Sequence, residues 1–128
     1  MKPTRHLACA AIGALALAGS GGTAAHGDER VDQGHKLFKD QGCPQCHGFG
    51  GKGDGYLLNM LKEPVHMHDW TEPQFLKGLS DDDLFAITKQ GGEPLGKSKI
   101  MIAYGHKMSD DEIRTVIVFI RSLGTPTP

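Results

Sequence analysis

The chain has 128 residues, a length that suits a single domain. Its 14 basic and 15 acidic side chains nearly balance, which argues against a nucleic-acid-binding protein, because such proteins carry a basic excess. Only 38% of the residues are hydrophobic and 6% are aromatic, so few side chains are available to form a core. We therefore expect a bound group or a covalent link to stabilise the domain.

Residues 1–25 have the pattern of a secretory signal peptide. Lys2 and Arg5 precede an apolar run at 7–18 that is too short to span a bilayer. Small residues at the end of the segment offer a cleavage site. We therefore predict a signal peptide over 1–25, a mature domain over 26–128 and a periplasmic location. Cleavage a few residues earlier, or an uncleaved leader that acts as a membrane anchor, is the alternative.

Residues 31–40 are predicted to form the first helix of the mature domain, because small or apolar residues recur near one face. Gly42 stands where a helix end is expected. Gly34 costs this helix about 1 kcal/mol relative to alanine, so it either marks a close helix crossing or is simply tolerated. The residues on the shared face are Val31, Gly34, Leu37 and Phe38.

The next residues, Cys43-Pro44-Gln45-Cys46-His47, have the C-x-x-C-H spacing of covalent haem c attachment. Two thiols on one short turn reach two vinyl groups on one porphyrin edge, and the following histidine supplies an axial ligand to the iron. The other axial ligand must come from elsewhere in the chain. We therefore predict one haem c, with thioether bonds to Cys43 and Cys46 and with His47 on the iron.

The C-x-x-C spacing alone also occurs in thioredoxin-like redox pairs and in zinc sites. The redox alternative requires a βαβ context, and no β-rich run flanks the motif. The zinc alternative requires a second Cys/His pair, for which His66 and His68 are candidates with poor spacing. Cys9 falls in the predicted leader, so the mature chain keeps only the two motif cysteines and has no thiol left for a disulfide.

A glycine-rich run at 48–55 contains the pattern G-x-G-x-x-G, but no strand precedes it, so dinucleotide binding is rejected. We interpret the run as a flexible loop around one haem edge, where the backbone approaches the porphyrin closely.

A short helical turn is predicted at 56–60, and residues 61–78 are predicted to be a loop because prolines, Pro73 among them, interrupt regular structure. Trp70 in this loop either packs on the haem and donates its N–H to a propionate, or is a plain core aromatic.

Ser80 is predicted to begin the next helix, with Asp83 as its capping-box partner, and Gly91-Gly92 to end it. Residues 93–105 are predicted to be irregular and long enough to pass across one haem face.

The last helix is the clearest, because Ser109 and Glu112 form a capping box and Gly124 ends the periodic pattern. Arg114 and Arg121 are placed on its polar side. Its apolar stripe consists of Ile113, Val116, Ile117, Phe119 and Ile120. No strand-length alternating run occurs anywhere, so the fold class is all-α.

Together these elements resemble class I cytochrome c over nearly all of the predicted mature chain. The resemblance rests on the helix with Gly34 and Phe38, the C-x-x-C-H motif, the helix from Ser80, a methionine loop at 99–105 and the last helix with Phe119. It implies a cytochrome c fold of three to five helices around one covalently bound haem. It also implies that the first and last helices cross at Gly34 and Phe119. Similar proteins include bacterial periplasmic monohaem cytochromes and domains attached to oxidoreductases.

The resemblance further implies that a methionine is the sixth ligand of the haem iron. Met101 is the predicted ligand, because it lies in the loop before the last helix and is followed by Ala103 and Tyr104 as the family pattern expects. Ile102 departs from that pattern, since a proline usually follows the ligand methionine. The departure would make the iron–sulfur bond more labile.

The other methionines and histidines have competing interpretations. Met108 directly precedes the Ser109 cap and is predicted to be the hydrophobic staple against Ile113. Met60 and Met67 come early in the chain, in segments better placed along the haem edge, and core packing is their default interpretation. The histidines that offer bis-His ligation instead are His66, His68 and His106.

A haem with both axial positions filled leaves no site for a substrate, so we expect a single-electron carrier without catalytic residues of its own. Redox partner proteins are expected to dock transiently at the exposed haem edge. We expect a monomer or weak oligomer, with membrane contact only through a partner complex or an uncleaved leader. Two alternatives stay open: a haem subunit of an oxidoreductase complex, and a haem sensor with a displaceable sixth ligand.

Overall fold

The computed structural model describes residues 23–125, and every regular element within them is helical, which confirms the predicted all-α class. The elements are α1 (Thr23–Asp40), α2 (Pro44–His47), the 3-10 helix η1 (Tyr56–Met60), α3 (Pro73–Lys77), α4 (Asp81–Gln90), the 3-10 helix η2 (Glu93–Leu95) and α5 (Asp110–Leu123). Most of the predicted signal peptide lies outside the described residues. Among residues 23–125, no helix is both long and apolar enough to cross a membrane.

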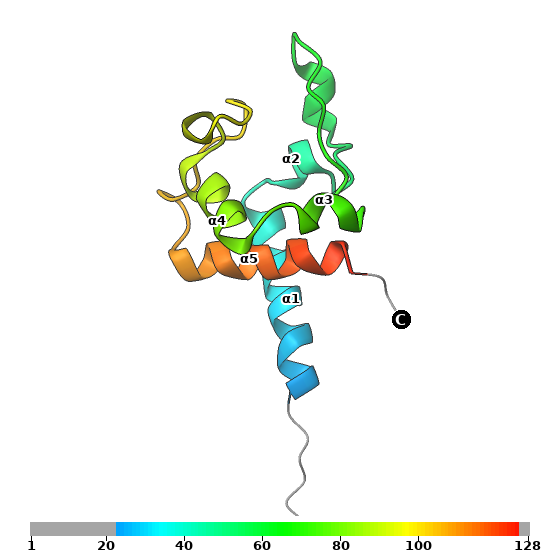
Figure 1. Cartoon of the computed structure of the whole chain (residues 1–128), viewed down its shortest axis with the longest axis vertical. Coiled ribbons are helices and arrows are strands. Elements are labelled where there is room, and N and C mark those ends of the chain that lie inside the picture. The colour runs from blue at the N-terminus through cyan, green and yellow to red at the C-terminus, as the bar shows by residue number, and fades with distance from the viewer. Residues whose placement is uncertain (1–22, 126–128) are drawn as a thin grey trace, which may run out of the picture.

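The crossing of α1 and α5 organises the molecule (Figure 1). Gly34 lies at the crossing. A Cβ atom at this position would collide with the carbonyl oxygen of Thr115 and would lie 2.9 Å from Cβ of Phe119. Only glycine therefore lets the two helices approach this closely. The interpretation of Gly34 and Phe119 as crossing residues is confirmed, and the alternative of a merely tolerated glycine is wrong.

The apolar stripe predicted for the last helix forms most of the buried core. Phe38 of α1 is 1% exposed and its ring packs on that of Phe119, with centroids 5.3 Å apart. Met108 and Ile113 are both buried in the same cluster, as expected for the residues of a hydrophobic staple. The buried residues of α5 are Ile113, Thr115, Val116, Ile117, Phe119 and Ile120.

Both predicted capping boxes are present. The Ser80 hydroxyl accepts a hydrogen bond from the Asp83 N–H at 3.0 Å, and Asp83 accepts one from the Ser80 N–H at 2.8 Å. Ser109 and Glu112 repeat this exchange at the start of α5, at 3.3 and 2.8 Å. The hydrogen bonds from the Ser80 hydroxyl and N–H lower the pKa of Asp83, and those from Ser109 lower the pKa of Glu112. The starts of α4 and α5 are thus fixed by local sequence.

The structure differs from the sequence prediction in the start of α1 and in two short helices, α3 and η2, which lie in segments predicted to be loop or irregular. Helix α1 begins at Thr23, whereas the sequence prediction began it at Val31. The prediction missed residues 23–30 because they lack apolar periodicity, but they contain good helix formers. Residues 73–77 form α3 inside the predicted loop. Pro73 occupies the first helical position, where its missing N–H would have no partner within the helix in any case. This proline therefore begins a helix instead of interrupting one.

Arg121 was expected on the polar side of α5, yet it connects three elements. Its Nε donates a hydrogen bond to Asp81 at 2.7 Å, and its terminal N–H groups donate to the carbonyl oxygens of Leu76 and Leu79. The guanidinium thus ties α5 to the turn between α3 and α4. Arg114 instead makes an ion pair with Asp82 at 3.7 Å and lies over the ring of Phe85.

Candidate haem site

A cavity of about 440 Å³ lies among α1, α2, α4, α5 and the loops that precede α3 and α5. Its volume falls within the roughly 300–1,000 Å³ typical of sites for small molecules and cofactors. In Figure 1 the loop with η1 and the loop after α4 rise on opposite sides of the α2 segment. Most lining side chains are apolar. Those able to bind a metal or form a thioether are Cys43, Cys46, His47, His66, Met67, His68 and Met101.

The C-x-x-C-H motif forms one tight turn at the wall of this cavity. Gly42, with φ of +76°, lets the chain reverse after α1, and Pro44 then takes the first position of α2. The Cys43 carbonyl accepts hydrogen bonds from the N–H groups of Cys46 and His47 at 3.3 and 3.0 Å. Both thiols and the imidazole therefore leave the same turn and reach the same cavity.

Burial controls the charge of all three side chains. It raises the pKa of Cys43 to about 11 and also raises the pKa of Cys46. It lowers the pKa of His47 to about 4. At neutral pH the thiols are therefore protonated and the imidazole is uncharged. An uncharged imidazole keeps a nitrogen lone pair, as an iron ligand requires.

The two alternatives for the cysteine pair find no support in the described residues. A redox-active cysteine of a thioredoxin-like pair has a lowered thiol pKa, whereas the pKa values of Cys43 and Cys46 are both raised. Residues 23–125 contain no strand that would supply a βαβ context. Nor do they bring three or more His, Cys, Asp or Glu side chains together as a metal site. His66 and His68 line the cavity without completing a zinc site with the cysteines.

One aromatic ring covers the imidazole of His47. Trp70 stacks on it with centroids 4.2 Å apart, and Phe38 meets Trp70 edge-on at 6.1 Å. The Nδ1 atom of His47 is buried and has no hydrogen-bond partner among the described residues. A buried polar atom without a partner costs free energy, so this site favours a histidine that serves as a ligand. Trp70 packs as a core aromatic and also lines the cavity; its bond to a propionate stays a prediction.

Of the four methionines considered as ligands, two reach the cavity. Met101 lines it from the loop after α4, and Met67 lines it from the loop before α3. Met60 is 73% exposed at the end of η1, so the expectation that it packs in the core was wrong. Met67 lies at the cavity wall rather than in the buried core. Met108 is 4% exposed in the core and is not a wall residue.

The glycine-rich loop packs on the motif and not on the cavity. The N–H groups of Gly53 and Gly55 donate hydrogen bonds to the carbonyls of His47 and Cys46, at 2.9 and 3.2 Å. A Cβ atom at Gly55 would collide with the backbone of Gln45. None of residues 48–55 lines the cavity. The prediction of a flexible loop against the porphyrin was therefore wrong, and these glycines instead support the turn that carries the ligand.

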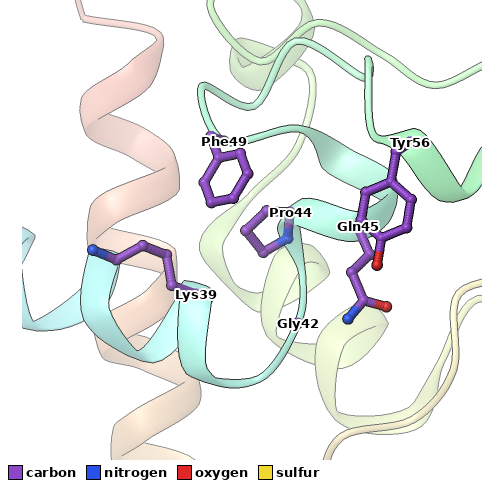
Figure 2. Close-up of a pocket in the computed structure, with 6 residues that line it drawn as sticks. All are labelled: Lys39, Gly42, Pro44, Gln45, Phe49 and Tyr56. Atoms are coloured by element: carbon purple, nitrogen blue, oxygen red, sulfur yellow. The ribbon is translucent and has the colours of Figure 1, made fainter.

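A second, smaller pocket of about 230 Å³ lies on the outer side of the motif turn (Figure 2). Phe49 and Tyr56, which are 71% and 58% exposed, flank Pro44 there. Gly42 and Gln45 line both this pocket and the main cavity. The residues of the motif turn therefore separate the main cavity from a surface patch formed by Phe49 and Tyr56.

Comparison with known proteins gives a match to a protein family. The model of the family described as "Cytochrome C oxidase, cbb3-type, subunit III" matches residues 29–120. The matched range includes the C-x-x-C-H motif, Met101 and most of α5. No match was found among curated proteins or among solved structures.

Proposed function

Because the chain belongs to the family described as cytochrome c oxidase, cbb3-type, subunit III, and therefore carries a c-type cytochrome domain, we propose that it is a periplasmic single-electron carrier with one covalently bound haem. The domain binds haem and transfers electrons to redox partners. The periplasmic location rests on the signal-peptide pattern of residues 1–25. In this proposal Cys43 and Cys46 would form the thioether bonds to the haem, and His47 and Met101 would bind its iron.

The observation that carries the proposal is that one apolar cavity brings together both cysteines, His47 and Met101. Each protonated thiol would add across a vinyl group of the haem, so that its sulfur would bond to one vinyl carbon and its hydrogen would go to the other. When bound, the haem supplies an iron that accepts and releases one electron. The neutral His47 imidazole and the Met101 thioether would bind the iron, and the apolar walls of the cavity would exclude water.

Replacing Met101 with alanine should abolish the weak visible band of the ferric protein that reports methionine–iron ligation, because the variant has no sulfur to offer. The matched control is Met67→Ala, which removes the other methionine at the cavity wall and should leave the band in place. Visible spectra of the ferric and ferrous proteins measure both variants.

The opposite pattern, with the band lost in Met67→Ala and kept in Met101→Ala, would identify Met67 as the ligand. A wild-type protein without the band would favour histidine ligation, for which His66 and His68 line the same cavity. Rapid carbon monoxide binding by the native ferrous protein at neutral pH would favour a sensor with a displaceable sixth ligand.

The description of the family favours a second candidate, a haem subunit of an oxidoreductase complex. Its members are described as a subunit of an oxidase, and the same haem domain serves either role. Purification from the native source distinguishes the two candidates. A stable complex of fixed stoichiometry supports the subunit, whereas a haem protein recovered alone supports the free carrier.

A further inference from the structure

The loop that carries Met101 is fastened to the end of α4 by its own backbone. The Gly92 N–H donates a hydrogen bond to the Met101 carbonyl at 2.9 Å, and the Gly92 carbonyl accepts one from the Lys97 N–H at 2.9 Å. Beyond Met101, the N–H groups of Tyr104 and Gly105 donate to the carbonyls of Thr88 and Lys89 at 2.9 and 3.0 Å. The loop is thus held on both sides of the methionine.

Two glycines make this attachment sterically possible. A Cβ atom at Gly91 would lie 2.9 Å from the Met101 carbonyl oxygen and 3.1 Å from the Ala103 nitrogen. A Cβ atom at Gly92 would collide with the carbonyl oxygen of Ser98. Both glycines are buried, and the atoms that they face belong to the backbone, which cannot turn aside as a flexible side chain can. Any side chain at either position must push the loop away from α4.

The two positions differ in backbone conformation, so their effects are separable. Gly91 has φ of 83° and ψ of 175°, a combination essentially restricted to glycine. Gly92 has φ of −81° and ψ of −34°, which any residue adopts. An alanine at 92 therefore tests the close approach alone, without backbone strain. The same loop contains Gly96, which has a left-handed conformation and where a Cβ atom would meet no other atom within 4 Å.

We propose that Gly91 and Gly92 are positioning residues that hold the Met101 sulfur in the haem cavity by letting its loop lie directly on the end of α4. This inference rests on the proposed ligation by Met101. Ile102 stands where the resemblance to class I cytochrome c implies a proline, so this loop has no proline after Met101 to stiffen it, and the contact with the two glycines restricts its movement. Neither glycine lines the cavity, and a Cβ atom at either position would meet backbone atoms of the Met101 loop. In the proposal they act through the backbone of that loop, to which Gly92 also donates a hydrogen bond at the Met101 carbonyl.

The test compares Gly92→Ala with wild type, as holoproteins, by the ferric methionine band and by carbon monoxide titration of the ferrous form. We expect the band to be lost and the apparent affinity for carbon monoxide to rise by about tenfold or more. That affinity scales with the fraction of molecules in which the sixth position is open. Helical circular dichroism should be retained. A folded Gly92→Ala protein with a wild-type band and wild-type affinity overturns the proposal.

Two controls separate positioning from general instability. Gly96→Asn changes the same loop at a site with open space, in a left-handed conformation that asparagine tolerates, and should leave the band unchanged. Gly34→Ala disturbs the crossing of α1 and α5 and should lower the melting temperature while the band persists below the transition. If Gly34→Ala loses the band as Gly92→Ala does, the effect is one of stability and the proposal is overturned.

A second measurement needs no glycine variant, in case Gly92→Ala fails to fold. Coupling between two parts of a protein is reciprocal. Release of Met101 should therefore loosen the loop, so the Gly92 and Lys97 amides should exchange hydrogen faster in Met101→Ala, while the Ile113 amide of α5 does not change. Unchanged hydrogen exchange at the amides of Gly92 and Lys97 overturns the proposal.

The spectra separate a failure of this inference from a failure of the proposed ligation. If Met101→Ala keeps the ferric methionine band, Met101 is not the ligand and the inference fails with the ligation. If Met101→Ala loses the band but Gly92→Ala keeps it, ligation by Met101 stands and only the positioning role of the glycines is wrong.

Discussion

Replacing both Cys43 and Cys46 with alanine should yield a protein without covalently bound haem, most of it unfolded. These are the cysteines in the described part of the chain, and both lie at the wall of the cavity. Without the haem, the apolar side chains that line the cavity of about 440 Å³ face water and lose the packing that a porphyrin would give them. A small domain has a total folding free energy of only about 5–15 kcal/mol, so the loss of this packing is expected to unfold most of the protein. Haem staining after denaturing electrophoresis and circular dichroism measure the two losses.

The matched controls for this prediction use one cysteine at a time. Cys43→Ala and Cys46→Ala each keep one thiol at the cavity and should retain some covalent haem in lower yield. Cys9→Ala should be indistinguishable from wild type, because Cys9 lies in the predicted leader. Haem that resists denaturation in the double variant would rule out thioether attachment at the motif.

Replacing Arg121 with alanine should lower the free energy of unfolding by about 3 kcal/mol. The variant removes the donors to the carbonyls of Leu76 and Leu79 and the ion pair with Asp81. A carbonyl that loses its donor away from water costs about 1–3 kcal/mol, so the two carbonyls account for most of the loss. Denaturant titration of the ferric holoprotein, followed by circular dichroism, measures the difference.

Arg114→Ala is the matched control, because Arg114 belongs to the same helix and forms one long ion pair on the surface. Its loss should be about 1 kcal/mol, from the exposed pair and from its contact with the Phe85 ring. Arg121→Lys should fall between the two alanine variants, since an ammonium group cannot span both carbonyls and the carboxylate. Equal losses for Arg121→Ala and Arg114→Ala would show that the carbonyl contacts contribute nothing.

The parts of the fold that could be predicted from sequence are those that depend on neighbouring residues. The starts of α4 and α5 were predicted correctly because a serine and an acidic residue three positions later suffice to form a capping box. The stripe of α5 was predicted for the same reason, since helical period alone determines which residues share a face. Helix α3 was missed because Pro73 is equally compatible with a break and with a first helical turn.

The parts that could not be predicted depend on contacts between distant segments. The glycines at 48–55 were assigned to the porphyrin, but the partner of Gly53 and Gly55 is the backbone of the motif turn. Arg121 was assigned to the polar side of α5, because no local pattern shows that two carbonyls of another segment face it. For the ligands, the motif placed Cys43, Cys46 and His47 on one turn. Only the fold shows that Met67 and Met101 share their cavity while Met60 and Met108 do not.

The crossing of α1 and α5 also bears on the order in which the chain folds. Arg30 and Asp111, which pair across the crossing, are 81 residues apart in the chain. Closing so large a loop is slow, so α1 is expected to pack on α5 late in folding. Until then Cys43 and Cys46 lie on a chain without a core, and burial has not yet raised their pKa values. Late docking of α5 would thus leave both thiols accessible for the thioether bonds that we propose.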